Sequence, residues 1–266
     1  MIYVQWLGGL SALFVVIERL SPRDAQQRVF RAGIGTDLIY LVFNGHFLGV
    51  LLATASGPVM RMMESLFERA GIQKAVHFGA LSGQPAWMQF LVALVIIDLV
   101  HWTIHNLLHR VPALWEFHKV HHSIEDLDWI GSFRFHWAEV VVYQSLSYVP
   151  LAVLGTRVDV LFWLAVFNTG MGHFNHANLR VSIGPLKYLL NSPGMHVWHH
   201  AHPDEAPLCN LGITLSVWDW LFGTAFMPGR IPRRLGFPGI ERFPRTAPGQ
   251  MLHPLPVERL LRGGPG

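Results

Sequence analysis

DLVHWTIHNLLHRVPALWEFHKVHH, residues 98–122, is the stretch around which the chain is organised. Six histidines fall within 22 of its residues: His101, His105, His109, His118, His121 and His122. The first three recur every fourth residue, so on a helix their rings form one stripe. The last three follow the spacing HxxHH, which also places imidazoles on one side of a helical turn. The stretch therefore predicts helices that carry a dense group of imidazoles.

The HxxHH spacing occurs a second time, at His196, His199 and His200. The chain has 16 histidines against 17 acidic residues, which is an unusual proportion. A lone histidine in an apolar helix is usually a hydrogen-bonded packing residue. Three isolated histidines fit that description: His46, His77 and His253. The paired HxxHH triplets indicate metal coordination instead.

The composition is that of a membrane protein. Of 266 residues, 51% are hydrophobic and 14% are charged, whereas a soluble domain averages about 25% charged residues. The single cysteine, Cys209, excludes an intrachain disulfide framework and a cysteine-rich metal site. The formal charge of +3 comes from scattered cations and does not favour nucleic acid as a partner. Any metal must therefore be bound by nitrogen and oxygen ligands.

Apolar runs predict an all-α integral membrane bundle of about four to five helices. The runs cover residues 2–19, 37–57, 86–105, 138–154 and 158–172. The first begins without preceding basic residues or a clear cleavage site, so we interpret it as a membrane helix and not as a cleaved signal peptide. The last two are separated by only three residues, which predicts an antiparallel hairpin. Both are of marginal length for a complete span.

We expect a single domain with three regions. Residues 1–85 hold membrane helices and an amphipathic interfacial helix at 59–76, after Gly57-Pro58 ends the second run. Residues 86–227 form the histidine-rich region that carries the chemistry. Residues 228–266 form an irregular tail rich in proline and arginine. If the third apolar run descends to the cytosol, the hairpin goes out and returns, so the clustered histidines converge in a helical cap on the cytosolic face.

This number of imidazoles fits a dinuclear metal centre. Neutral imidazole binds zinc, iron, copper and nickel, and the clustered rings exceed the four positions of one structural zinc site. The sequence lacks HExxH, the Glu-x-x-His pair of carboxylate-bridged di-iron bundles and a glycine-rich nucleotide loop. Electrons for any redox reaction must therefore come from a separate donor.

Two other classes of function stay open at this point. A membrane divalent-metal transporter or metal-binding protein would also use histidines, although transport favours ligands at several depths along a path. A helical membrane scaffold would have to keep a costly ionisable cluster buried without using it.

Five blocks of sequence support a more specific interpretation: DLVHWTIHNLLHRVPALWEFHKVHHS, FRFHWAE, HFNHANLR, SPGMHVWHH and NLGITLSVWDWLFGT. In order and spacing they resemble the fatty acid hydroxylase superfamily, which includes sterol desaturases and alkylglycerol monooxygenases. The resemblance implies a non-haem di-iron oxygenase of the membrane that hydroxylates or desaturates a lipid C–H bond. It implies dioxygen as co-substrate, an external electron donor of the cytochrome b5 or ferredoxin type, and two iron ions, with zinc as their substitute in a purified protein.

The resemblance also implies a set of ten metal ligands: His105, His109, His118, His121, His122, His173, His176, His196, His199 and His200. His101, one turn before the first of these, is an additional candidate on geometry alone. Five more residues are candidates to support the ligands from outside: Asp98, His136, Glu139, His202 and Asp219. For Asp98 a helix-end charge is the competing interpretation, and for Asp219 it is local capping.

One departure concerns the last block. Family members often carry an acid directly before the Asn-x-Gly of this block, whereas here Leu208 and Cys209 precede Asn210. The departure puts the subgroup in doubt and leaves the predicted ligands intact. The sequence does not select the lipid substrate, nor does it distinguish hydroxylation from desaturation.

Overall fold

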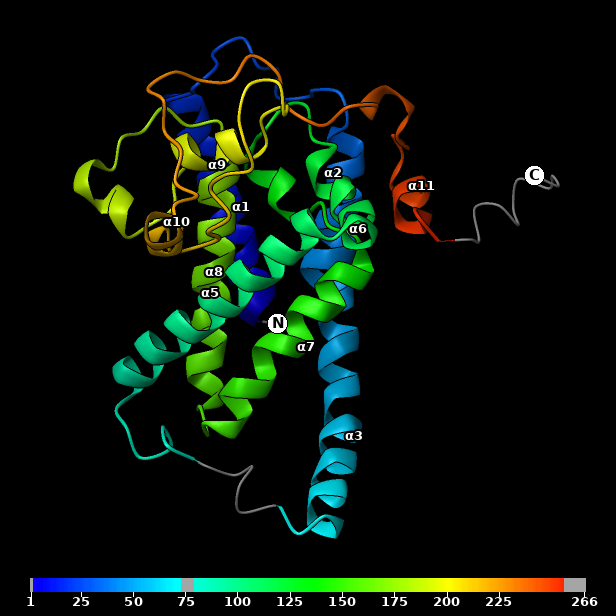
Figure 1. Cartoon of the computed structure of the whole chain (residues 1–266), viewed down its shortest axis with the longest axis vertical. Coiled ribbons are helices and arrows are strands. Elements are labelled where there is room, and N and C mark those ends of the chain that lie inside the picture. The colour runs from blue at the N-terminus through cyan, green and yellow to red at the C-terminus, as the bar shows by residue number, and fades with distance from the viewer. Residues whose placement is uncertain (1, 73–78, 256–266) are drawn as a thin grey trace, which may run out of the picture.

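The computed structural model describes residues 2–72 and 79–255, and this part of the chain is all-α, as predicted (Figure 1). The long helices are α1 (Ile2–Leu20), α3 (Leu48–Arg69), α5 (Ala86–Arg110), α7 (Trp137–Val153) and α8 (Val158–His176). The shorter ones are α2 (Ile34–Val42), α6 (Pro112–His122), α9 (Pro193–His199), α10 (Val217–Phe222) and α11 (Ala247–Leu252). A π-helical turn, η1 (Phe43–Phe47), joins α2 to α3, and 3-10 turns include η2 (Trp129–Phe133), η3 (Gly184–Tyr188) and η4 (Ile240–Arg242).

Three of the described helical stretches are long and apolar enough to cross a membrane: Ile2–Leu20, Ile34–Leu52 and Ala86–Arg110. Only 17%, 22% and 39% of these stretches, respectively, are buried inside the protein. Large apolar side chains such as Leu13, Val16 and Leu91 therefore lie on the outside of the bundle. An apolar exterior of this kind is stable when lipid surrounds it.

The second of these stretches differs from its prediction. We expected Gly57-Pro58 to end the helix and an interfacial helix to begin at residue 59, but α3 continues without interruption to Arg69. Part of the conflict between a helical proline and the residue before it comes from the Cβ of that residue, and glycine has no Cβ. The last residues of the expected interfacial helix, 73–76, lie outside the described part of the chain.

The histidine-rich stretch forms two helices because a proline interrupts it. Val111 is extended, with φ −98° and ψ 113°, and separates α5 from α6. Proline disfavours the helical conformation in the residue before it, while its own fixed φ suits the first turn of a new helix. The chain therefore turns between Arg110 and Pro112, and α6 packs against α5. This turn brings His118 back to His105.

The predicted hairpin is confirmed as α7 and α8. Its connection needs Gly155, which has a φ of +69°, and a Cβ at this position would lie 3.1 Å from Cα of Gly79. Below the histidines, an apolar core that includes Ile97, Leu151 and Leu164 joins α5 to the hairpin. The hairpin thus holds α5 along its length.

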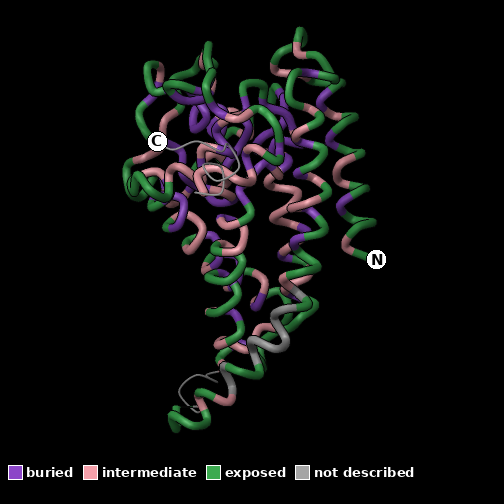
Figure 2. Tube along the Cα trace, turned by 90° about the vertical axis from the view of Figure 1, so that its right-hand side faces the viewer, coloured by how far each residue is buried: buried purple, intermediate pink, exposed green. Residues whose placement is uncertain are grey.

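Buried residues gather at one end of the molecule, shown at the top of Figure 2, while the far end of α3 is mostly exposed. The tail contributes to the buried end. Its Phe237, Ile240 and Phe243 pack with Tyr40 of α2 and Val120 of α6. The described part of the tail is largely irregular and contains the short helix α11; residues 256–266 lie outside the described part.

Candidate metal centre

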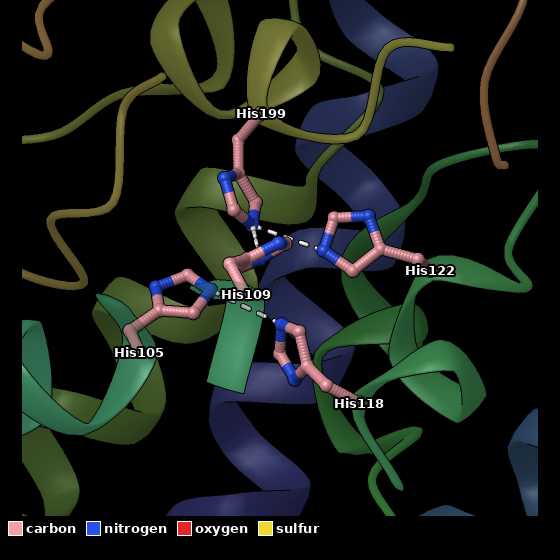
Figure 3. Close-up of side chains that lie close together, drawn as sticks. All are labelled: His105, His109, His118, His122 and His199. Atoms are coloured by element: carbon pink, nitrogen blue, oxygen red, sulfur yellow. Dashed lines mark hydrogen bonds between the residues drawn. The ribbon is translucent and has the colours of Figure 1, made fainter. Parts of the chain in front are cut away.

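Nine histidines form two adjacent groups at the buried end of the bundle. In each group, one ring nitrogen from every member lies within 4.8 Å of the others. The first group contains His105, His109, His118, His122 and His199 (Figure 3). The second group contains His121, His176, His196 and His200. The predicted convergence of the clustered histidines is therefore present for these nine.

Helical geometry explains how each HxxHH triplet contributes to both groups. On α6, His118 and His122 are one turn apart and face the first group, while His121 faces the second. At α9 the division is reversed, because the one-turn pair His196 and His200 belongs to the second group and His199 to the first. The two triplets therefore fix the two groups next to each other.

Backbone carbonyls fix the tautomers of several rings. In the first group, Nδ1 of His105 lies 2.7 Å from the carbonyl oxygen of Leu211, and Nδ1 of His199 lies 3.0 Å from that of Cys209. A carbonyl oxygen can only accept, so each Nδ1 carries the hydrogen. In a neutral ring the lone pair is then on Nε2, the atom that faces the other histidines.

The same argument applies to the second group. Nδ1 of His121 donates to the carbonyl of Arg134 at 3.1 Å, and Nδ1 of His176 donates to that of Gly172 at 2.9 Å. Yet Nε2 of His121 and Nε2 of His176 lie only 3.2 Å apart. Both nitrogens carry lone pairs, so this contact repels unless a cation lies between them.

The spacing of these nitrogens fits a metal ion. Neighbouring Nε2 atoms are 3.1 Å apart for His105 and His118 and 3.1 Å apart for His122 and His199. Two nitrogens bound to one ion at about 2.0–2.1 Å lie about 2.9–3.4 Å apart for bond angles between a right angle and the tetrahedral value. The residues present therefore fit two metal ions, one for each group.

Burial keeps the rings neutral, as metal ligands must be. Removal from water, followed by the neighbouring imidazoles, holds the pKa of His118 and His121 well below the usual range of histidine. The same causes, in the same order, act on the pKa of His196 and His200. Neither group includes a carboxylate or a thiolate, and an all-imidazole set suits zinc, iron, copper or nickel.

Glu139 is the one predicted supporting acid that touches a ligand. Its Oε1 accepts from Nδ1 of His118 at 2.9 Å, and both side chains are 1% exposed. Such a carboxylate orients the ring and raises its basicity as a ligand.

Asp98 and Asp219 accept hydrogen bonds from backbone amides of the loop that follows α9. Asp219 accepts from the amides of Leu211 and Gly212 at 2.8 and 2.7 Å, which is the local backbone capping that competed with ligand support. Asp98 accepts from the amides of Thr214 and Leu215 at 2.8 and 3.0 Å. Their common effect is to hold the loop whose Leu211 carbonyl orients His105.

Four predicted histidines lie outside both groups. His173, expected as a ligand, faces Ser132 with Nδ1 at 3.0 Å and Ser11 of α1 with Nε2 at 3.4 Å, because its side of α8 packs against α1 and η2. His101 pairs with Ser147 at 2.8 Å.

The other two contact no ligand. His136 caps α7 through the amide of Ala138 and reaches the carbonyl of Met251. His202 lies beside Asp204 at 3.0 Å. Of the isolated histidines, His253 contacts Glu116, His46 is in neither group, and His77 lies outside the described residues.

Sequence reasoning missed the backbone carbonyls that orient the rings. Arg134 is the clearest case. Its carbonyl oxygen accepts a hydrogen bond from Nδ1 of His121, and its guanidinium forms a buried ion pair with Asp37. Every residue has a carbonyl, so no pattern in the sequence could have identified these partners. Arg134 itself, as a charged residue in the block FRFHWAE, was the feature of the sequence that could have drawn attention to this segment.

A cavity of about 290 Å³ opens beside the histidines, between α5, α7 and α8. Its wall includes ligand candidates from both groups, among them His105, His121 and His176. Farther along, Ile97, Leu161 and Leu164 make it apolar. An apolar chain placed here would reach both groups.

Comparison with known proteins agrees with this geometry. The chain is 28% identical to an ornithine lipid hydroxylase of Rhizobium tropici over 219 residues, which cover 82% of this chain and 65% of that protein. It is 32% identical to an alkylglycerol monooxygenase of Danio rerio over 154 residues, which cover 56% of this chain and 32% of that protein. The chain thus spans less than two thirds of the length of these relatives. No solved structure matches significantly.

The family model described as fatty acid hydroxylase matches residues 90–224. The match covers just over half of the chain and contains every histidine of the two groups. On this match, the chain belongs to the fatty acid hydroxylase family.

Proposed function

We propose that this chain is a non-haem di-iron oxygenase of the membrane that hydroxylates or desaturates a C–H bond of a lipid. The observation that supports it best is the position of the two histidine groups, each with converging ring nitrogens, beside a cavity with apolar walls. In the hydroxylation, one atom of dioxygen enters the C–H bond and the other leaves as water, with two electrons and two protons supplied from outside. Desaturation would remove two hydrogens from neighbouring carbons and, with the same two external electrons and two protons, reduce dioxygen to two molecules of water.

In this proposal, the nine grouped histidines hold two iron ions, which supply the activation of dioxygen. His173 is not assigned as a ligand, because both of its nitrogens face serine side chains. Glu139 positions His118, and the loop held by Asp219 positions His105. Ile97, Leu161 and Leu164 would bury the lipid chain and exclude water from the carbon that reacts.

We further propose that the histidine end lies on the cytosolic side, where an external one-electron carrier of the cytochrome b5 or ferredoxin type can reach it. The loop between α1 and α2 at this end carries Arg23 and Arg28, in agreement with the excess of basic residues in cytosolic loops. A cysteine at exposed Arg233 tests the orientation: a membrane-impermeant maleimide should label it only after the cells are opened. Labelling in intact cells would place the site on the opposite side.

The experiment for the activity uses purified, iron-loaded protein in lipid with a chemical reductant and ¹⁸O₂. A lipid product that carries one ¹⁸O is expected from the unchanged chain, and none from His121→Ala or His199→Ala, one from each group. His46→Gln, outside both groups and exposed, is the control and should keep full activity. Because desaturation leaves no label in the lipid, loss of two mass units is counted as turnover as well. Full turnover by either alanine variant would refute the proposal.

The alternative of a metal transporter has less support. The nine rings form two adjacent groups in which every ring but that of His109 is buried, whereas a transport path needs ligands at several depths. Zinc flux into proteoliposomes, without oxygen consumption under reducing conditions, would decide in favour of the transporter.

A further inference from the structure

Two short elements beside α5 carry an exposed apolar patch. They are η3 and α10, which lie on the same side of the molecule in Figure 1. Six large side chains form the patch, and all but that of Trp220 are more than half exposed: Leu186, Tyr188, Leu189, Trp220, Leu221 and Phe222. We call these six residues the apolar wing. Contiguous apolar side chains mark a site of interaction, whereas single exposed ones need no explanation.

The two elements of the wing are joined by hydrogen bonds. The indole N–H of Trp220 donates to the carbonyl of Lys187 at 2.9 Å, and the hydroxyl of Ser216 donates to the same carbonyl at 2.6 Å. The amide of Ser216 donates to the carbonyl of Leu189 at 3.0 Å. Tyr188 packs on Trp220 with ring centroids 4.8 Å apart. These paired groups can enter an apolar medium without leaving a donor unsatisfied.

The wing continues the outer, apolar side of α5. Leu91, Val95 and Leu99 recur every fourth residue and are exposed, so they form a stripe along this membrane span. Trp102 lies about one turn further, and its ring stacks on Phe222 of the wing with centroids 4.7 Å apart. The stripe and the wing are therefore one continuous apolar surface.

Two buried carboxylates attach α10 to α5. Asp98 of α5 accepts from the indole N–H of Trp218 of α10 at 2.9 Å. In the opposite direction, Asp219 of α10 accepts from the indole N–H of Trp102 of α5 at 3.2 Å. The wing cannot move away from the membrane span without breaking both bonds.

The length of α5 gives the depth of the wing. Trp87, in the first turn of α5, is exposed, and tryptophans are enriched where a span enters the interface. At about 1.5 Å per residue, Leu107 lies about 30 Å further along α5, which is the thickness of the hydrocarbon core. Trp102 is then about 7–8 Å inside this second boundary. Interfacial helices bury their apolar face to a similar depth, about 5–10 Å.

We propose that the wing is an interfacial anchor, which lies in the lipid at the membrane surface on the histidine side with its apolar side chains below the headgroups. Lys187, whose ammonium lies 5.2 Å from the ring centroid of Tyr188, then extends from the same element to the headgroup layer. The partner is the bilayer itself, because a soluble protein cannot reach a surface that continues into hydrocarbon. The inference goes beyond the proposed function and holds for any reaction at the histidines.

The anchor sets the level of the metal centre. His105 and His109 lie on either side of Leu107 along α5, so the first histidine group is at the boundary between hydrocarbon and headgroups. Ile97, which lines the cavity, lies about 15 Å deeper than Leu107 along the helix. The cavity is therefore at the depth of the acyl chains.

The test measures the depth of spin labels on the full chain, loaded with zinc and embedded singly in nanodiscs of phosphatidylcholine and phosphatidylglycerol. Nitroxides are attached to Leu186→Cys and Leu221→Cys, one from each element of the wing. Power saturation compares their collisions with dioxygen and with a water-soluble nickel chelate. Both labels should collide more with dioxygen, at a depth of about 5–10 Å. The unchanged chain, whose single Cys209 is buried, is the blank for the labelling.

Ile231→Cys is the matched control. Ile231 is also apolar and is 55% exposed, but it follows Arg230 in the arginine-rich loop, so its label should collide mainly with the nickel chelate. Val95→Cys on α5 is the deep reference. If the wing labels behave like the control, the wing lies in water and the proposal is overturned. If they are shielded from both reagents, protein covers the wing, which overturns the proposal as well.

A label at Leu107→Cys tests the level of the metal centre separately, since Leu107 is exposed and lies between two ligand candidates. Its depth should fall within about 5 Å of the boundary, the rise of about three residues. A depth equal to that of Val95→Cys would place the centre inside the hydrocarbon, and one equal to that of Ile231→Cys would place it in water; either result overturns the predicted level. Zinc content per chain shows that each variant is folded.

Discussion

Glu139 on α7 accepts a hydrogen bond from Nδ1 of His118 on α6, at 2.9 Å and with both side chains almost completely buried. The opposite nitrogen of His118 lies 3.1 Å from Nε2 of His105. One imidazole therefore connects a buried carboxylate to the first histidine group. The carboxylate fixes the ring so that its lone pair faces the other ligands.

Replacing Glu139 should weaken metal binding. Glu139→Ala removes the acceptor of His118, and metal affinity should fall about 10–100-fold. Glu139→Gln keeps an amide oxygen that can accept from Nδ1, so its loss should be smaller. The measurement is metal content per chain after dialysis against graded chelator. Glu125→Gln, on the exposed surface, is the control; equal retention by Glu139→Ala and the control would contradict the role of Glu139.

Gly212→Ala should disturb the loop that orients His105. A Cβ on Gly212 would lie 2.5 Å from the carbonyl oxygen of Leu215 and 2.8 Å from Oδ2 of Asp219, so the loop must move. Overpacking of this kind costs about 1–3 kcal/mol, and displacement of the Leu211 carbonyl should also lower metal affinity. Melting temperature and metal content measure the two effects.

The control for this change is Gly35→Ala, since a Cβ there meets no atom within 4 Å. Its melting temperature and metal content should match those of the unchanged protein. If Gly212→Ala also matched it, the loop would have no part in holding the site.

The sequence predicted the all-α class, the hairpin and the convergence of ten histidines, of which nine converge, because hydropathy and helical spacing act locally. It could not separate His173 from His176. Both lie in the last turn of α8, but His173 faces Ser11 of α1, a contact between segments that are distant in the chain. Which neighbour a helix face meets depends on packing, and no spacing within α8 encodes it.

The continuation of α3 past Gly57-Pro58 was missed for a different reason. The proline was treated as a helix end, although the preceding glycine lacks the Cβ that contributes to the usual steric conflict. For Asp98 and Asp219, position beside the motifs indicated importance, but their partners are loop amides and not histidines. The spacing of residues therefore identified the ligand candidates better than the groups that hold them.

Cys209 should be an unreactive thiol in the native protein. It is 2% exposed, and burial, with a smaller effect of Asp219, raises its pKa to about 12. Only the thiolate reacts with iodoacetamide, so alkylation at pH 8 should be more than about 100-fold slower than that of a free cysteine. Mass spectrometry of timed samples measures the rate.

Cys209 is connected to the first histidine group, because its carbonyl oxygen accepts a hydrogen bond from Nδ1 of His199. Stripping the metal with chelator should therefore speed the alkylation of Cys209. A cysteine at exposed Gln26 is the control and should react at one rate with and without metal. A native Cys209 that reacts as fast as Gln26→Cys would show that this loop is open.

Asp37→Asn should destabilise the end of the molecule that holds the second histidine group. Asp37 accepts from Arg134 at 2.5 Å and from Arg31 at 2.8 Å, and its side chain has no exposed surface. Breaking a buried ion pair by removing one partner costs about 3–5 kcal/mol, since the remaining charge has no compensation. The Arg134 carbonyl holds His121, so the free energy of unfolding in detergent and the metal content should fall together.

Asp159→Asn is the matched control, because Asp159 pairs with Arg157 on the surface, where the two side chains are 52% and 54% exposed. Water and salt already screen that pair, so its loss should leave stability and metal content unchanged. If Asp37→Asn lost stability but kept both metals, the buried ion pairs would support the fold without positioning His121. If both variants behaved like the unchanged protein, the arginine–aspartate cluster would contribute to neither, and His121 would be held by its own helix alone.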